Sequence, residues 1–194
     1  ALYSAHRIYS RRFSSYGAIP QGVLWRDADR QQRRFQLLTK DIRNHSINDF
    51  GCGYGGLLGF LRDHDFQGEY TGYDMNREMI AHAKKTYPEA AFHCAKNVFQ
   101  AADYTLISGT YNLKMMATRE VWWKWVQKSL RCCWEHSTIG MAFNMREDTV
   151  ADQHHDFFYA NAQQLVAFCQ EKLGGNVRIE REGEMGDIHV YVLR

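Results

Sequence analysis

The residues with the clearest chemical meaning lie in positions 47–60, which read INDFGCGYGGLLGF. Asp49 precedes three alternating glycines, Gly51, Gly53 and Gly55, and a leucine-rich pattern with helical spacing follows. Glycine adopts positive φ and lets a ligand approach the backbone, and a helix start offers unpaired N–H groups. The order strand, glycine turn, helix therefore predicts a site for a nucleoside-bearing ligand at the carboxyl edge of a parallel sheet.

Three interpretations of this turn are open. The string from Gly51 to Gly56 also matches GxGxxG, the dinucleotide fingerprint, which is weakly specific by itself. A glycine-rich loop without a ligand is the second interpretation. Asp49 favours the third, a ligand that carries an ammonium, because a carboxylate at this position attracts a cation and repels a phosphate.

Asp74 is the second signal, and it follows the predicted strand 69–73. It lies 21 residues beyond Gly53, about the distance at which nucleoside-binding α/β folds place an acid that holds the ribose. A carboxylate accepts two hydroxyl hydrogen bonds in a fixed fork. We therefore expect Asp74 to bind a ribose.

The D-x-G-x-G-x-G order from Asp49 to Gly55 resembles the first motif of the class I S-adenosylmethionine-dependent methyltransferases. The resemblance covers about residues 45–194. It implies S-adenosylmethionine as the cofactor, with the glycine turn against its methionine part. The cofactor-binding positions that we expect are Arg34, Asp49, Gly51, Cys52, Gly53, Gly55, Asp74, Met75, Asn97, Val98, Ser108 and Gly109.

Two departures from the family pattern affect these expectations. The family often has an acid after its third strand, where this chain has Lys96 and Asn97, so the amide of Asn97 is expected to contact adenine instead. The NPPY string is absent after the fourth strand, where Ser108 to Asn112 reads SGTYN. That absence argues against the branch that modifies adenine or glutamine.

The pattern of elements predicts a single-domain, Rossmann-like α/β fold. We expect a mostly parallel seven-stranded sheet, helices on both of its faces, and an antiparallel hairpin at the carboxyl end. Residues 1–44 are predicted to form a helical cap or lid over the cofactor site, and residues 45–194 the core. The expected helices are 3–16, 25–38, 76–87, 115–134 and 162–173, and the later strands are 91–95, 104–107, 137–143, 176–182 and 187–194.

The acceptor side is expected around Tyr111 and Asn112 and in the long connection 144–161, which holds His154, His155 and Tyr159. A histidine there could serve as a general base, because its side chain titrates near neutral pH. Adjacent histidines on a strand or helix point apart, so no metal site is predicted. The tryptophans of 115–134 could form a base-stacking surface, but packing against the sheet is the favoured interpretation.

Composition bears on the number of domains, on membrane spans and on the state of the cysteines. The 194 residues are 45% hydrophobic and 24% charged, which is typical of one globular domain. No long apolar run predicts a membrane span, and Arg7, Arg11 and Arg12 precede no apolar segment of a secretory signal. Five cysteines without a C-x-x-C pair indicate reduced thiols in a cytoplasmic protein.

Charge is unevenly distributed along the chain. Residues 1–45 carry nine Arg or Lys against three Asp, a formal charge of +6, whereas the whole chain has +2. This basic segment could bind nucleic acid, form a solvated helix face, or contact an anionic group of the ligand. The hypotheses for function are methylation of a small molecule at N, O or C, methylation of RNA or protein, a non-catalytic S-adenosylmethionine-binding module, and NAD binding.

Overall fold

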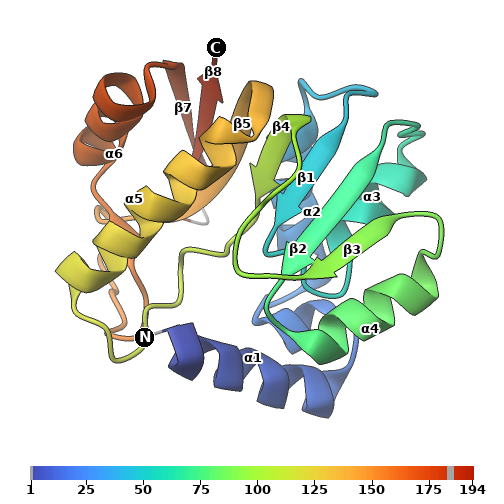
Figure 1. Ribbon diagram of the computed structural model, residues 1–194. Helices are drawn as coiled ribbons and strands as arrows, with labels where there is room; N and C mark the ends of the chain where they lie inside the picture. Colours follow the sequence, from blue (N-terminus) through green and yellow to red (C-terminus); the bar gives the residue numbers. More distant parts are fainter. Residues whose placement is uncertain (1, 183–185) are drawn as a thin grey trace.

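A mostly parallel β-sheet forms the centre of the computed structural model, which describes residues 2–182 and 186–194 (Figure 1). Its strand order is β3-β2-β1-β4-β5-β8-β7, and the two-residue β6 adds to β5. Only β8 runs antiparallel to its neighbours in the described sheet. The strands are β1 Ile47–Phe50, β2 Tyr70–Asp74, β3 Ala91–Cys94, β4 Ala102–Ile107, β5 Ser137–Glu147, β6 Tyr159–Ala160, β7 Asn176–Glu182 and β8 Asp187–Leu193.

Two apolar clusters fill the two faces of this sheet. One contains buried residues of α5 and α6, and the other contains buried residues of α2, α3 and α4. The predicted fold class is therefore confirmed, with β6 as an addition to the seven expected strands. The helices are α1 Leu2–Tyr16, α2 Ala28–Thr39, α3 Gly56–Asp63, α4 Arg77–Thr86, α5 Arg119–Glu135 and α6 Ala162–Phe168, with a 3₁₀ turn at Pro20–Val23 and a π-helical turn at Cys169–Leu173.

Side-chain caps determine where several helices begin. Asp27 accepts a hydrogen bond from the backbone N–H of Arg30 at 2.8 Å, and Asn76 accepts from the second and third residues of α4. Thr118 caps α5, which begins at Arg119 and not at residue 115 as expected. Such caps satisfy N–H groups that the first helical turn leaves unpaired.

The tryptophan-rich helix α5 packs against the sheet, as the favoured interpretation predicted. Trp122 is 1% exposed and Trp134 is 7% exposed, and both belong to the larger apolar cluster. Trp123 and Trp125 are half-buried and pack against the same cluster. Burial of these large rings stabilises the contact between α5 and the sheet.

Strand β5 is longer than the predicted 137–143. It continues to Glu147 because residues 144–146 pair antiparallel with residues 187–189 of β8, and residues 146–147 pair with β6. The expected connection 144–161 therefore begins as sheet. The predicted hairpin is present, and residues 183–185 of its turn lie outside the described part of the chain. None of the described helices has the length and apolar character that crossing a membrane requires.

Candidate active site

A cavity of about 400 Å³ opens at the carboxyl ends of β1, β2 and β4. Figure 1 shows α1 running across this end of the sheet, beside α4. Loops after the three strands line its floor, and residues of α1, the following turn and α2 line its other walls. The cavity has the size and position of a ligand site in a doubly wound α/β fold.

The glycine turn fits closely against the neighbouring loop and strand. Gly51 has φ +83°, and a Cβ there would lie 2.1 Å from Oγ1 of Thr110. The N–H groups of Gly51 and Cys52 donate to the carbonyl of Tyr73 at 2.7 and 3.1 Å. The protein thus uses these N–H groups itself, whereas a dinucleotide site offers the turn to a pyrophosphate.

Asp74 is fixed by two backbone donors. Its Oδ2 accepts from the N–H of Gly53 at 2.9 Å, and its Oδ1 accepts from the N–H of Asn76 at 2.8 Å. Burial raises the pKa of this carboxyl, and the two backbone bonds oppose that shift. The side chain lines the cavity together with Met75, at the end that Tyr9 of α1 covers.

Asp49 is 2% exposed and also lines the cavity. The hydroxyl of Tyr70 donates to its Oδ2 at 2.5 Å. Burial raises its pKa to about 7, and the Tyr70 bond only partly offsets this effect. Within the described chain no cationic side chain lies within 4 Å of this carboxylate. A ligand ammonium would supply the missing positive charge.

Arg34 projects from α2 into a buried network. Its Nε donates to Oδ2 of Asp187 at 2.5 Å, and its guanidinium lies 4.4 Å from the ring centre of Trp25. Asn144 donates to the same Asp187 oxygen at 2.9 Å and accepts from the N–H of Gly109 at 2.9 Å. This chain of contacts joins α2 to the loop after β4.

Two residues after β4 border the cavity directly. The hydroxyl oxygen of Ser108 is buried and has no hydrogen-bond partner among the described residues, so a ligand group can pair with it. Gly109 has φ +69°, and a Cβ there would lie 2.8 Å from the Trp25 ring. Glycine at this position lets the Trp25 ring cover the loop.

Three of the twelve expected cofactor positions do not line the cavity. Gly55, at φ +87°, shapes the turn, and its backbone packs near the ring of Tyr87. Val98 is buried in the cluster beneath α5, and Asn97 is exposed beyond β3. Ala95 lines the cavity where the amide of Asn97 was expected.

Tyr111 and Tyr159 lie in the core and not on the acceptor side. Tyr111 is fully buried, its hydroxyl pairs with Ser129 at 2.8 Å, and its ring packs against Trp125. The Tyr159 hydroxyl accepts from the N–H of His154 at 2.9 Å. The expected placement of both rings is wrong, because Tyr111 is part of the apolar cluster beneath α5 and Tyr159 is 3% exposed, and burial stabilises both rings.

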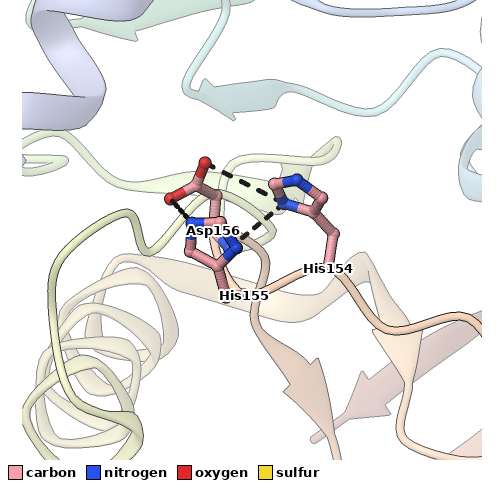
Figure 2. A group of neighbouring side chains, drawn as sticks. All are labelled: His154, His155 and Asp156. Carbon is pink, nitrogen blue, oxygen red and sulfur yellow. Dashed lines mark hydrogen bonds and ion pairs between the residues drawn. The ribbon is translucent and has the colours of Figure 1, made fainter.

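His154 and His155 lie on the surface outside the cavity, with side chains 58% and 80% exposed. Figure 2 shows both imidazoles beside Asp156, and the rings stack at 4.5 Å. The expectation that they point apart is wrong, because residues 154–156 form a turn. Potential ligand atoms of the three residues lie within 4.8 Å of one another. However, Nδ1 of His154 already accepts from the N–H of Asp156.

Sequence reasoning did not assign Tyr9, Trp25 or Trp125 to the cavity wall. Asn112, which was expected near the acceptor, does line the cavity, and so do Arg146 and Phe157 of the connection 144–161. Sequence reasoning gave Asn112 no specific contact. It also missed Asp187, the partner of Arg34. The isolated aspartate at the start of the last alternating strand was a signal for Asp187. The others come from separate elements and share no local motif.

Comparison with known proteins agrees with this geometry. Residues 47–138 match the family described as "Methyltransferase domain". Rv1506c of Mycobacterium tuberculosis, whose name assigns it to the methyltransferases, is 30% identical over 139 residues, 69% of this chain and 84% of that protein. The chain belongs to the class I S-adenosylmethionine-dependent methyltransferases. Its cofactor is S-adenosylmethionine.

Two solved methyltransferase structures illustrate the shared fold. Magnesium protoporphyrin IX methyltransferase from Synechocystis PCC 6803, with bound S-adenosylmethionine, has a TM-score of 0.61 at 9% identity, over 86% of this chain and 77% of that chain. Human N-acetylserotonin methyltransferase, in complex with the same cofactor, has a TM-score of 0.68 at 11% identity. The match covers 100% of this chain and 58% of that chain.

Proposed function

We propose that the cavity holds S-adenosylmethionine along the carboxyl ends of β1, β2 and β4. Asp49 would pair with the cofactor ammonium, Asp74 would accept the ribose hydroxyls, and Arg34 would meet the carboxylate. Support comes from the buried Asp49 that lacks a cation and from Asp74, which backbone donors hold at the cavity. Arg34 keeps N–H groups beyond the Nε that Asp187 occupies.

We further propose that the methyl acceptor is a small molecule. The main support is that α1 and the segment before α2 form part of the cavity wall, through Leu2, Ala5, Tyr9 and Trp25. An acceptor must fit beneath these elements, which suits a small compound better than a folded RNA or protein. The two solved relatives are named for methylation of magnesium protoporphyrin IX and N-acetylserotonin, both small molecules.

The reaction that this geometry supports is a direct displacement. The bound cofactor supplies a methyl group on a sulfonium, which is already a good leaving group. The protein then has to place the acceptor atom in line with that methyl and exclude water. His154 and His155, the expected bases, lie outside the cavity, so we propose that placement is the main contribution of the described residues.

The test is a transfer assay with S-adenosylmethionine labelled at its methyl group. An extract is separated into small molecules, RNA and protein, and each fraction is incubated with the enzyme. We expect label in the small-molecule fraction, and much less with Asp74→Ala, which removes the proposed ribose contact. Asp156→Ala, on the surface turn, is the matched control and should keep the activity. Label confined to RNA or protein would contradict the small-molecule proposal.

A further inference from the structure

The end of the cavity beyond β4 and β5 has apolar and aromatic walls. Leu113 and Phe157 form an isolated β-bridge there, and Trp125 of α5 lines the same end. Asn112 connects these segments, because its Oδ1 accepts from the N–H of Arg146 at 3.1 Å. This part of the wall lies away from Asp74 and Met75, at the side where the acceptor would approach the proposed cofactor site.

Arg146 is the charged group at this end. The central carbon of its guanidinium lies 4.4 Å from the ring centre of Phe157, in a cation–π contact. A guanidinium carries five N–H donors, so donors remain for a bidentate partner beside this contact with the ring. Arg146 is half-buried and lines the cavity.

Among the described residues, Arg146 takes part in no ion pair. In residues 2–182 and 186–194, no carboxylate lies within 4 Å of Arg146. Asp187 stands opposite Arg146 in the β5–β8 register, but it pairs with Arg34. The neighbouring arginines of this region, Arg119 and Arg181, each have an acidic partner.

Charge along the described cavity wall is polarised. Its two acids, Asp49 and Asp74, lie at the ends of β1 and β2. Its arginines are Arg26, Arg30, Arg34 and Arg146, from the α2 side and β5. A partly buried cation without a partner is stabilised by an anion.

We propose that the methyl acceptor is a small aromatic carboxylate, whose carboxylate Arg146 binds and whose ring packs between Trp125 and Phe157. This inference rests on the proposed small-molecule function and names its substrate class. A carboxylate matches the fork of one guanidinium. A phosphate would carry more charge than one arginine can balance.

The test measures binding to the protein saturated with S-adenosylhomocysteine. The probes are 4-hydroxybenzoate, 1-naphthoate and indole-3-carboxylate, each paired with its uncharged primary amide, and phenyl phosphate. Calorimetry should show at least one acid binding about 10- to 100-fold more tightly than its amide, as hydrogen bonds to a charged group predict. Phenyl phosphate should bind more weakly than that acid.

Arg146→Gln should remove the preference for the acid over the amide and leave S-adenosylhomocysteine affinity within about twofold. Arg146→Lys, which keeps the charge but loses the fork, should retain part of the preference. Arg131→Gln is the matched control, because Arg131 also stacks on a ring, that of Phe168, but lies outside the cavity.

Three results would overturn this inference: no acid preferred over its amide, an unchanged preference in Arg146→Gln, or tighter binding of phenyl phosphate. The comparison of acid with amide in the unaltered protein remains valid even if the Arg146 variants do not fold. Failure of the protein to bind S-adenosylhomocysteine would instead reject the proposed cofactor site, so the two failures are distinguishable.

Discussion

Asp49 illustrates how one residue can couple proton binding to cofactor binding. Its carboxyl is buried against Tyr70, and its pKa is about 7. Near and below pH 7 the free protein therefore keeps a large fraction of Asp49 protonated and neutral. An ammonium in contact with Asp49 favours the ionised form, so binding at low pH must release this proton.

The expected outcome is that affinity for S-adenosylhomocysteine rises as the pH increases from 6 to 8, by up to about tenfold per pH unit below the pKa. Calorimetry across this range measures it, and Asp49→Asn should flatten the slope at lower affinity. Asp156→Ala controls for titration of surface groups. An equally steep slope in Asp49→Asn would contradict the ammonium contact.

At the scale of elements, the buried ion pair between Arg34 and Asp187 joins α2 to β8. Both side chains are at most 5% exposed. Removing one charge leaves the other buried without compensation, which costs about 3–5 kcal/mol. We therefore expect Arg34→Met and Asp187→Asn each to lower the free energy of unfolding by several kcal/mol.

The double variant Arg34→Met/Asp187→Asn should lose less than the sum of the two single variants, by about 1–3 kcal/mol, because neither charge is then left alone. Urea unfolding measures these differences. Strictly additive losses would show that the two groups contribute independently. Arg131→Gln, on the exposed side of α5, should remain near the unaltered stability.

Helix α1 is a second element whose behaviour can be tested. Ala5 is its only buried residue, yet Leu2, Ala5 and Tyr9 line the cavity. Asn76 also donates to Ser10 at 3.0 Å, which joins α1 to the start of α4. A helix with so little buried surface opens easily, and a ligand beneath it adds contacts.

We expect S-adenosylhomocysteine to slow amide hydrogen exchange in α1 by about tenfold or more, if α1 covers the bound ligand. Exchange measured by mass spectrometry reports this protection for each peptide. Helix α6 lies outside the cavity and serves as the internal control. Equal exchange in α1 with and without the ligand would reject its role as a lid.

At the scale of the whole molecule, folding balances part of the charge asymmetry of the chain. Several cations of the basic first 45 residues pair with acids of the carboxyl-terminal hairpin: Arg33 with Glu182, Arg34 with Asp187 and Lys40 with Glu180. These cations are therefore less available to phosphates. The basic first 45 residues are therefore a weaker indication of nucleic-acid binding.

The expected outcome is that single-stranded RNA binds no more tightly than about 1 µM at 150 mM salt, the range of non-specific binding. Fluorescence anisotropy with a labelled oligonucleotide between 50 and 200 mM salt measures the affinity and its salt dependence. A dissociation constant well below about 1 µM that rises steeply with salt would instead support RNA methylation.

Patterns of neighbouring residues were sufficient to predict much of the fold and of the cofactor site. The run from Asp49 to Gly55, the acid at the end of β2 and the alternation of β7 and β8 are patterns of neighbouring residues, whose backbone and side-chain chemistry can be read in sequence. They predicted the sheet, the family and the cofactor. The longer β5 was not predictable, because its last residues are strand through pairing with β8, over 40 residues away, and with the short β6.

Only the tertiary structure decided which polar groups are left without partners. The sequence shows Arg34, Arg146 and Asp187 as three charged residues on three distant segments. Folding pairs Arg34 with Asp187 and leaves Arg146 facing the cavity over Phe157. It also turns Tyr111 and Tyr159 into the core and places His154 and His155 on the surface. These outcomes depend on long-range packing and burial, which a pattern of nearby residues does not encode.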